Sequence, residues 1–293
     1  MPKRRRTRWA TSRAPAPLAD LRESIRKHWA PKADLDFLRK QLERRGADCK
    51  ASDLAGFDQL HSGGLESTTR LIEWAEIERG VRVLDLGSGL GGTARCLAET
   101  IGCRVTALEL SAELDGCARE LTTIFGLEGK VDHRCGDLGE IDEVGVYDVV
   151  LLQHVDMHLP DKVDDYRRCR NWLKLDKKSR IIWHDWLAGS GGDLLLPVPW
   201  AAEGEEISFL STEQRFRQDL AAADLVMTDF RDLSGETAQW FGKSQTKLKG
   251  VLEKVRGEEQ ARFERLLAEV EGVLANLAEK RLIPFFAKAV PRP

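Results

Sequence analysis

Cysteine is scarce in this chain, and the cysteines that occur are widely scattered. The sequence contains no C-x-x-C pair; its six cysteines are Cys49, Cys96, Cys103, Cys117, Cys135 and Cys169. This scatter argues against a zinc site and against a disulfide framework. Several of these positions fall within predicted strands or helices, where cysteine acts as a small apolar residue. We therefore expect a reduced, cytoplasmic protein.

Long apolar runs and a strong net charge are also absent. No apolar run approaches the roughly 18 residues that a membrane-spanning helix needs, so we expect no membrane span. The formal net charge is only −3, which gives no overall field to attract nucleic acid. The charge is uneven, because residues 1–19 carry six basic side chains and no acidic one. We predict that residues 1–17 form a basic disordered arm; a nuclear or organelle address, or a patch for an anionic surface, is the alternative.

The chain does contain a regular alternation of apolar strands with helices. Its 293 residues are 42% hydrophobic, enough for one large α/β domain with additions. The predicted strands are 81–86, 103–108, 131–135, 147–153, 180–186, 225–232 and 281–290, and the predicted helices between them include 92–101, 111–125, 161–173 and 212–223. This order predicts a doubly wound, mostly parallel, seven-stranded sheet that is covered on both faces. Ligands then bind at the carboxyl ends of the strands.

Two further segments extend this core. Residues 18–64 are predicted to form an N-terminal helical extension, and residues 65–293 the main domain. A polar loop over residues 57–66 precedes a helix for which Ser67 or Thr68 is the expected cap. Residues 188–210 are long and irregular, with buried-type side chains such as Trp200, so we predict an inserted lid or binding loop there.

The most informative stretch is the glycine-rich turn that follows the first predicted strand. The strand ends at Asp85, and the turn continues through Gly87, Ser88, Gly89 and Gly91. A carboxylate here would repel a pyrophosphate but would stabilise an amino-acid ammonium. Glu109 ends the second strand about 20 residues later, the spacing expected of a ribose-binding acid. Together these features indicate S-adenosylmethionine; a nicotinamide dehydrogenase is the alternative that Asp85 disfavours.

The turn resembles the first motif of the class I S-adenosylmethionine-dependent methyltransferases. That motif reads acid-x-Gly-x-Gly-x-Gly and matches residues 85–91 in full. The resemblance implies a Rossmann-like methyltransferase fold in which Asp137 meets the adenine amino group and the next backbone N–H meets a ring nitrogen. The residues expected to bind the cofactor are Asp85, Gly87, Ser88, Gly89, Gly91, Glu109, Leu110, Asp137, Leu138 and Gln153.

The fourth strand and its loop narrow the resemblance. Gln153, His158 and the segment 160–162, together with the loop at residues 58–64, resemble sarcosine/dimethylglycine and, more loosely, phosphoethanolamine methyltransferases. This chain departs from that group at His154, where the group carries an acid or amide that contacts the substrate amine. It also lacks the tyrosine that the group often has in its N-terminal lid, because its two tyrosines, at positions 147 and 166, lie elsewhere.

We therefore predict methyl transfer from S-adenosylmethionine to a small soluble acceptor, most simply an amine such as a glycine derivative. His158 is the candidate general base, since a neutral imidazole can accept the ammonium proton; the alternative is that it only holds the loop through a backbone hydrogen bond. His154 is expected to shape the acceptor pocket, and His61, Trp186 and Trp200 to contact the acceptor. We expect no metal, because transfer from a sulfonium needs no Lewis acid.

Other functions remain open at this stage. The same fold serves C- or O-methylation of a lipid-like or polyketide acceptor. A catalytically inactive, cofactor-binding interaction protein is a further alternative. We expect a small-molecule partner, no nucleic acid, and a monomer or homodimer.

Overall fold

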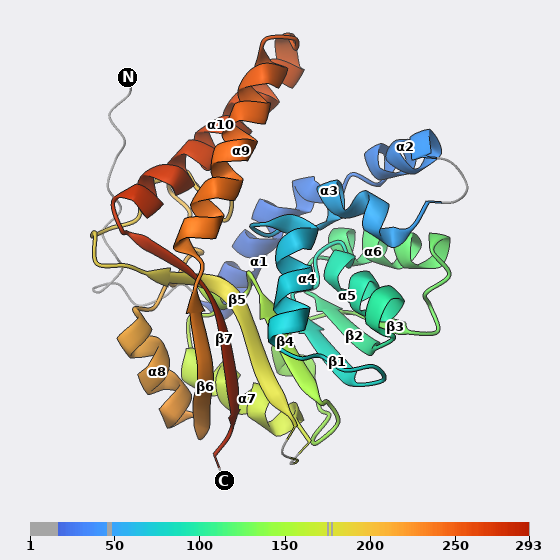
Figure 1. Ribbon diagram of the computed structural model, residues 1–293, viewed down its shortest axis with the longest axis vertical. Helices are drawn as coiled ribbons and strands as arrows, with labels where there is room; N and C mark the ends of the chain where they lie inside the picture. Colours follow the sequence, from blue (N-terminus) through green and yellow to red (C-terminus); the bar gives the residue numbers. More distant parts are fainter. Residues whose placement is uncertain (1–16, 46–48, 175, 177, 293) are drawn as a thin grey trace.

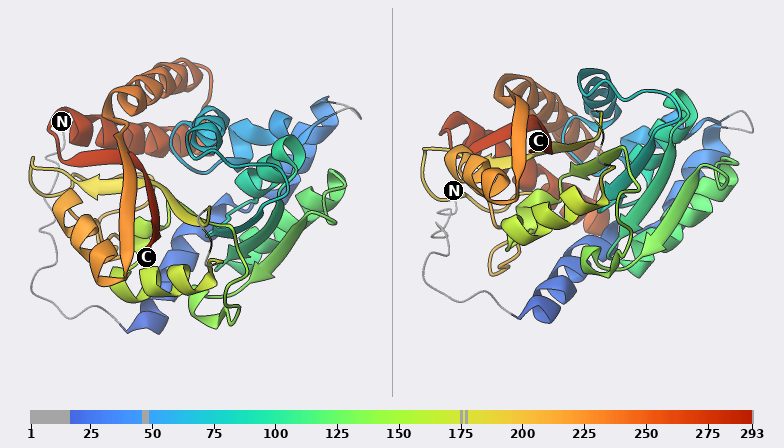
Figure 2. Two further views of the ribbon diagram at one scale, coloured as in Figure 1. Left: turned by 60° about the horizontal axis from the view of Figure 1, so that its bottom comes forward. Right: turned by 90° about the horizontal axis from the view of Figure 1, so that it is seen from below.

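The computed structural model describes residues 17–45, 49–174, 176 and 178–292 (Figure 1). The predicted basic arm therefore lies almost wholly outside the described residues. Within them, helices flank both sides of one twisted sheet (Figure 2).

The sheet has seven strands in the order β3-β2-β1-β4-β5-β7-β6. Their bounds are β1 Arg82–Leu86, β2 Arg104–Glu109, β3 Val131–Cys135, β4 Val149–Gln153, β5 Arg180–Ala188, β6 Leu225–Asp232 and β7 Leu282–Pro291. The strands β1 to β5 pair in parallel, whereas β7 runs antiparallel to both β5 and β6. This confirms the predicted doubly wound, mostly parallel sheet. The strand order reverses between β1 and β4, which places a crevice at their carboxyl ends.

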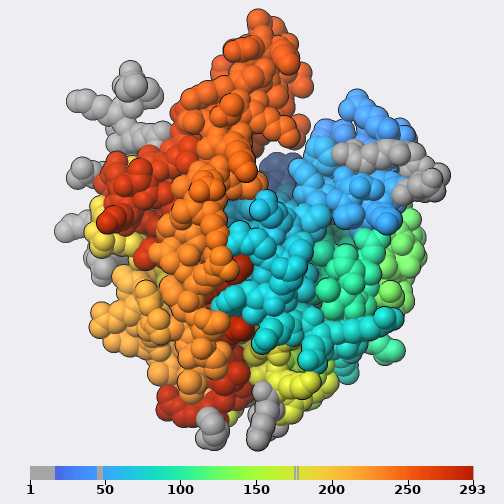
Figure 3. Space-filling model, in the orientation of Figure 1, coloured from blue at the N-terminus to red at the C-terminus, as the bar shows by residue number. Residues whose placement is uncertain are grey.

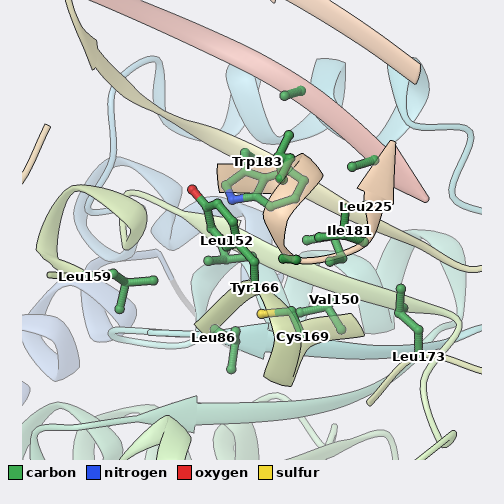
Figure 4. Packing of buried hydrophobic residues seen from close by; sticks show 14 of the residues in the cluster. Leu86, Val150, Leu152, Leu159, Tyr166, Cys169, Leu173, Ile181, Trp183 and Leu225 are labelled. Carbon is green, nitrogen blue, oxygen red and sulfur yellow. The ribbon is translucent and has the colours of Figure 1, made fainter. Parts of the chain in front are cut away.

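Alternating side chains of the strands pack against helices on the two faces. On one face, strand residues such as Val150, Leu152 and Trp183 pack against Tyr166 and Phe216, and Figure 4 shows several members of this cluster. The helices there are α7 (Lys162–Trp172) and α8 (Glu213–Ala222). The other face is covered by α4 (Gly64–Trp74), by α5 (Gly92–Cys96) and by the π-helical turn Leu97–Ile101 that continues α5. Near β2 and β3, α6 (Ala112–Ile124) completes the layers.

Helix α4 begins earlier than predicted. It begins at Gly64, with Gly63 as N-cap in the left-handed region at φ 79°, and it ends at Trp74. Ser67 and Thr68 therefore lie inside the helix and do not cap it. The hydroxyl of Thr68 is buried and donates to the side chain of Gln59, so these polar residues face a polar cluster next to the site.

The N-terminal segment is largely helical. It consists of α1 (Leu18–Trp29), the 3₁₀ turn Ala30–Lys32, α2 (Leu35–Arg45), the 3₁₀ turn Ala51–Leu54 and α3 (Ala55–Asp58). Helix α1 crosses the carboxyl ends of the parallel strands, because Arg22 bonds Asp137 after β3 and Arg26 bonds the Leu110 carbonyl after β2. The extension therefore covers the edge of the sheet where a ligand is expected.

The segment between β5 and α8 is irregular but well packed. Leu194, Leu196, Val198, Trp200 and Ile207 are all buried in one cluster. This cluster also includes side chains of α9 (Ser234–Leu252) and α10 (Gly257–Ala278). These two helices pack against each other and stand out from the body (Figures 1 and 3). None of the helices in the described ranges combines the length and the apolar composition that a bilayer crossing requires.

Candidate functional site

A cavity of about 290 Å³ lies at the carboxyl ends of the strands, beneath α1. Its floor is made by residues 85–90 after β1, 108–110 at the end of β2, 136–139 after β3 and 153–155 at the end of β4. The side chains of α1 that line it are Leu18, Leu21, Arg22, Ile25 and Trp29. The cavity thus brings together segments that are far apart in the sequence, as the strand order predicts.

Asp85 is a buried carboxylate in the wall of this cavity. It is 2% exposed, and its Oδ2 has no hydrogen-bond partner in the described structure. Burial, with the nearby Glu109 charge as a second cause, raises the pKa of Asp85 to about 7. Burying a carboxylate without a partner costs free energy. A cationic ligand group in the cavity would pair with Asp85 and offset this cost. Asp85, the predicted ammonium partner, therefore lies in the cavity wall with one carboxylate oxygen unpaired.

The glycine turn adopts the strained backbone that its sequence suggests. Gly87 has φ 64°, and a Cβ at this position would collide with the side chain of Val155. Ser88 and Gly89 also line the cavity, and the buried Ser88 Oγ has no partner. Gly91 does not line the cavity; it has φ 74° and is the N-cap of α5. Gly91 therefore shapes the turn and the helix start, whereas Ser88 and Gly89 face the space that a ligand would occupy.

Glu109 ends β2 and lies beside the glycine turn. Its two carboxylate oxygens accept hydrogen bonds from the backbone N–H groups of Gly89, at 2.8 Å, and Ser111, at 2.9 Å. Burial raises the pKa of Glu109, and these N–H groups oppose the shift. Glu109 is thus held rigidly beside Leu110, and both residues line the cavity as predicted.

Asp137 lies at the far end of the same cavity, together with Leu138. Its Oδ1 accepts hydrogen bonds from Arg22 of α1, at 2.6 Å, and from the Gly139 N–H, at 2.8 Å. Nothing in the sequence around Arg22 predicts its contact with Asp137. This ion pair and the bond from Arg26 to the Leu110 carbonyl, at 3.1 Å, fasten α1 over the expected adenine end.

Gln153 ends β4 inside a buried polar cluster. Its Oε1 accepts from Thr93 at 2.7 Å, and its Nε2 lies 3.0 Å from Nδ1 of His184. The cluster continues through Ser62, whose Oγ lies 3.0 Å from Nε2 of His154. Gln153 therefore connects α5, the helix that follows the glycine turn, to the histidines. It also lines the cavity.

His158 is buried, and both of its ring nitrogens are engaged. Its Nδ1 lies 2.6 Å from the Ile207 carbonyl oxygen, to which it must donate, and its Nε2 accepts from Trp29 Nε1 at 3.2 Å. Burial lowers the pKa of His158 to about 4. No lone pair of the neutral ring is left for an acceptor proton while Trp29 is in place. The geometry thus favours the alternative in which His158 holds the loop, with Trp29 of α1 on its other side.

His61 and His154 also line the cavity. The ring nitrogens of His61 face the Ser62 carbonyl oxygen, at 3.2 Å, and Gln59 Oε1, at 2.7 Å. His154 has φ 58°, a strained value for a non-glycine residue. Burial lowers the pKa of both rings, that of His61 to about 4 and that of His154 well below its ordinary range.

Trp186 and Trp200 are placed differently from the prediction. Both are 1% exposed, and their rings stack on each other with centroids 4.9 Å apart. Neither is among the residues that line the cavity. The two indoles form part of the apolar cluster beneath the irregular segment, because their large surfaces are buried more completely there. The structure thus corrects their assignment as acceptor-contacting residues. The aromatic residue in the cavity wall is Trp29, which sequence analysis missed.

A buried ion pair also escaped sequence analysis. Arg95 Nη2 and Asp58 Oδ2 are 2.6 Å apart, and both side chains are almost fully buried. The pair joins the helix after the glycine turn to α3. In the described part of the chain, no group of three or more His, Cys, Asp or Glu residues is arranged to hold a metal ion.

Comparison with known proteins finds similarity to methyltransferases. Residues 83–176 match the family pattern of a methyltransferase domain. The chain is 29% identical over 189 residues to a glycine/sarcosine/dimethylglycine N-methyltransferase of Actinopolyspora halophila, covering 64% of this chain and 33% of that protein. It is 30% identical over 116 residues to phosphoethanolamine N-methyltransferase 3 of Arabidopsis thaliana, covering 39% and 23% of the two chains.

The fold has solved counterparts as well. A phosphoethanolamine N-methyltransferase of Haemonchus contortus, in complex with phosphomonomethylethanolamine and S-adenosylhomocysteine, superposes with a TM-score of 0.69 at 17% identity. The match covers 80% of this chain and 55% of that one. Residues 83–176 thus match a methyltransferase-domain pattern, and the chain adopts the Rossmann-like fold of these methyltransferases. It spans only about a quarter to a third of the length of the two curated relatives above.

Proposed function

We propose that this protein transfers the methyl group of S-adenosylmethionine to a small amine. The observation that carries the proposal is the unpaired, buried Oδ2 of Asp85 in the wall of the cavity. An ammonium is the ligand group that such a carboxylate would bind most favourably. The methyltransferase-domain match over residues 83–176 and the amine-methylating relatives support the same assignment.

In this proposal, different residues of the cavity bind different parts of the cofactor. Asp85 would hold the amino-acid ammonium of the cofactor, with Ser88 and Gly89 beside it. Glu109 is positioned for the ribose hydroxyls, and Asp137 with Leu138 for the adenine. Bound S-adenosylmethionine supplies an activated methyl group on a sulfonium. The protein then has to orient the acceptor and to exclude water, and α1 covers the cavity for that purpose.

The acceptor would occupy the part of the cavity near His154, His158 and Trp29. This part is enclosed by apolar residues of α1 and by Leu60, Val155 and Leu159. Such surroundings disfavour a charged ammonium and favour the neutral amine, which is the nucleophilic form. Trp29 also lines this part of the cavity, and the Lys32 ammonium lies 3.8 Å from its ring centroid. In this proposal His158 positions the loop and Trp29.

A binding and transfer experiment tests the proposal. Isothermal titration should show binding of S-adenosylmethionine and S-adenosylhomocysteine, with NAD much weaker. A radiolabelled-methyl assay should then give transfer to glycine, sarcosine, dimethylglycine or phosphoethanolamine. Tighter binding of NAD than of S-adenosylmethionine would refute the cofactor assignment. Binding of S-adenosylmethionine without transfer to any amine, acid or lipid would favour the inactive, interaction-protein alternative.

One observation favours a second candidate function. The α1 wall of the cavity is largely apolar, with Leu18, Leu21 and Ile25 facing the space. An acceptor with an apolar body would bury this surface well. C- or O-methylation of a lipid-like acceptor is therefore the second candidate, and lipid extracts belong in the same assay.

Location and assembly remain part of the proposal. All six cysteines lie among the described residues and none forms a disulfide, which agrees with the expected cytoplasmic location. We propose a monomer or homodimer, which light scattering after gel filtration would distinguish from larger assemblies.

A further inference from the structure

Three histidines, His61, His154 and His184, cluster around Ser62 beside the cavity. The ring centroids of His154 and His184 are 4.9 Å apart, and those of His61 lie 5.9 and 5.4 Å from them. His154 follows β4 in a left-handed conformation with φ 58°. A strained backbone persists only where surrounding contacts hold it. The left-handed conformation of His154 is therefore maintained by contacts with neighbouring residues.

The nitrogens of these rings are not equally engaged. Both nitrogens of His61 have partners in Ser62 and Gln59. For His154, Nε2 bonds the Ser62 hydroxyl at 3.0 Å, whereas Nδ1 has no partner among the described residues. Because His154 also lines the cavity, its Nδ1 is the ring atom that remains for a ligand.

The hydrogen bonds behind His154 decide which of its nitrogens carries the hydrogen. Gln153 accepts from Thr93 through Oε1 and so donates through Nε2 to Nδ1 of His184, at 3.0 Å. A neutral imidazole has one N–H, so the hydrogen of His184 is on Nε2, which lies 3.4 Å from Ser62 Oγ and 3.5 Å from Ser67 Oγ. The Ser62 hydroxyl is buried, and among its contacts in the described structure Nε2 of His154 is the acceptor that remains for its hydrogen. This leaves the hydrogen of His154 on Nδ1.

We propose that His154 is a specificity-determining residue that donates Nδ1–H to an oxyanion of the acceptor, a carboxylate or a phosphate. This proposal rests on the proposed function and names the acceptor more closely: an amine that also bears an oxyanion. An N–H donor does not bind an ammonium. The carboxylates that flank His154 do not bind one either, because Asp156 is engaged by Lys162 and Tyr166, and Asp185 by backbone N–H groups.

The charges around His154 fit this role. Burial and the neighbouring His184, His61, His158 and Lys32 all lower its pKa well below the ordinary range. The ring therefore stays neutral at physiological pH and keeps a single, directed N–H. Of these neighbours, the three histidines also have lowered pKa values and stay neutral, whereas the Lys32 ammonium would attract an oxyanion and repel an ammonium.

Nitrogen NMR on protein labelled with ¹⁵N-histidine tests the hydrogen-bond chain without any activity. We expect His154 as the Nδ1–H tautomer and His184 as the Nε2–H tautomer, both unchanged between pH 6 and 8. Ser62→Ala should abolish the preference of His154 for one tautomer. Ser67→Ala is the matched control, since Ser67 contacts His184 at 3.5 Å and not His154. An Nε2–H tautomer of His154, or its protonation within that pH range, would overturn the proposal.

Acceptor binding tests the oxyanion directly. With S-adenosylhomocysteine present, dimethylglycine, phosphoethanolamine and dimethylamine offer a carboxylate, a phosphate and no oxyanion, respectively. We expect one of the first two to bind at least tenfold more tightly than dimethylamine, and which one it is identifies the oxyanion. His154→Ala should weaken that ligand roughly 10- to 100-fold, and His154→Gln, which keeps an N–H donor, less. His154→Asp should reverse the order of preference.

The outcomes separate this proposal from the proposed function. Equal or tighter binding of dimethylamine would refute the oxyanion, as would binding of none of the three to a protein that binds S-adenosylhomocysteine. Failure to bind S-adenosylhomocysteine would instead refute the proposed function. The tautomers read by NMR would still decide whether the chain from Gln153 to His154 exists.

Discussion

Replacing Asp85 by Asn separates the ligand-binding role of this carboxylate from its structural cost. The substitution keeps the size of the side chain and removes its negative charge. In the ligand-free protein the Asp85 carboxyl is buried, its Oδ2 is unpaired, and its pKa is raised to about 7. Binding an ammonium favours the ionised form and must lower this pKa. The substitution should therefore weaken the cofactor and stabilise the empty protein.

The size of the binding effect follows from the lost charge-assisted hydrogen bond. Such a bond is worth about 1.5–3 kcal/mol, which corresponds to a weakening of about 10- to 150-fold. In the wild-type protein, the affinity should also fall by about tenfold for each pH unit below 7, because the carboxyl must lose a proton before it pairs with the ammonium. Above pH 7 the affinity should be constant. The Asn variant should show no such dependence through this range.

The stability effect has the opposite sign. The ordinary pKa of an aspartate is 3.8, and that of Asp85 in the folded protein is about 7, so the folded state holds a proton that the unfolded state has lost. The stability of the wild-type protein thus falls as pH rises from about 4 to 7, by up to about 4 kcal/mol. The Asn variant escapes this loss. Its Tm should exceed that of the wild type at pH 8 by several degrees, and the difference should vanish near pH 4.

Two measurements decide the matter. Titration calorimetry of S-adenosylhomocysteine between pH 5.5 and 8.5 gives the affinity and the number of protons released. Calorimetric or fluorescence melting of the ligand-free protein gives the Tm difference at pH 8 and pH 4. Unchanged affinity in the variant, or a wild-type affinity that is flat below pH 7, would refute the assignment of Asp85 as the ammonium partner.

Three further predictions concern the other residues of the site. Glu109→Gln should weaken S-adenosylhomocysteine about 10-fold or more by calorimetry, and an unchanged Kd would remove Glu109 from the ribose site. His158→Ala should lower the Tm and the turnover together, because it releases Ile207 and Trp29, but the pH profile of the remaining activity should match the wild type; a lost pH-dependent limb would restore His158 as the base. Trp200→Ala should cost about 3–5 kcal/mol in unfolding free energy with an unchanged Kd for S-adenosylhomocysteine, and a large change in that Kd would return Trp200 to the cavity.

The part of the cavity that we propose holds the cofactor was largely predictable from the sequence because its signals are local. The glycine turn, Asp85 and Glu109 each stand beside the strand that positions them, and parallel pairing of β1 with β2 brings the two acids to one edge. Strand alternation is equally local, since it depends on residues two apart. The interactions that form the turn and the strands act over a few residues, so the local sequence is enough to predict them.

The acceptor end was less predictable because its contacts are distant in the sequence. Trp29 and His158 are separated by 129 residues, and Arg22 and Asp137 by 115. No motif or spacing near either partner in the sequence indicates these hydrogen bonds. Trp186 and Trp200 illustrate the reverse error: an indole in an irregular segment is compatible both with a binding wall and with a core, and only the packing of α9 and α10 decides between them.

The two ends also differ in how freely they can change. At the cofactor end, Gly87 is confined by Val155 and Glu109 by two backbone N–H groups, so the ligand-binding atoms are part of the scaffold itself. At the acceptor end, the wall consists of side chains from α1 and of His154, which follows β4. A different acceptor therefore requires only a few substitutions there, whereas a different cofactor requires a new backbone. For this reason His154 is a position in the cavity wall at which we expect this chain to differ from the methyltransferases that it resembles.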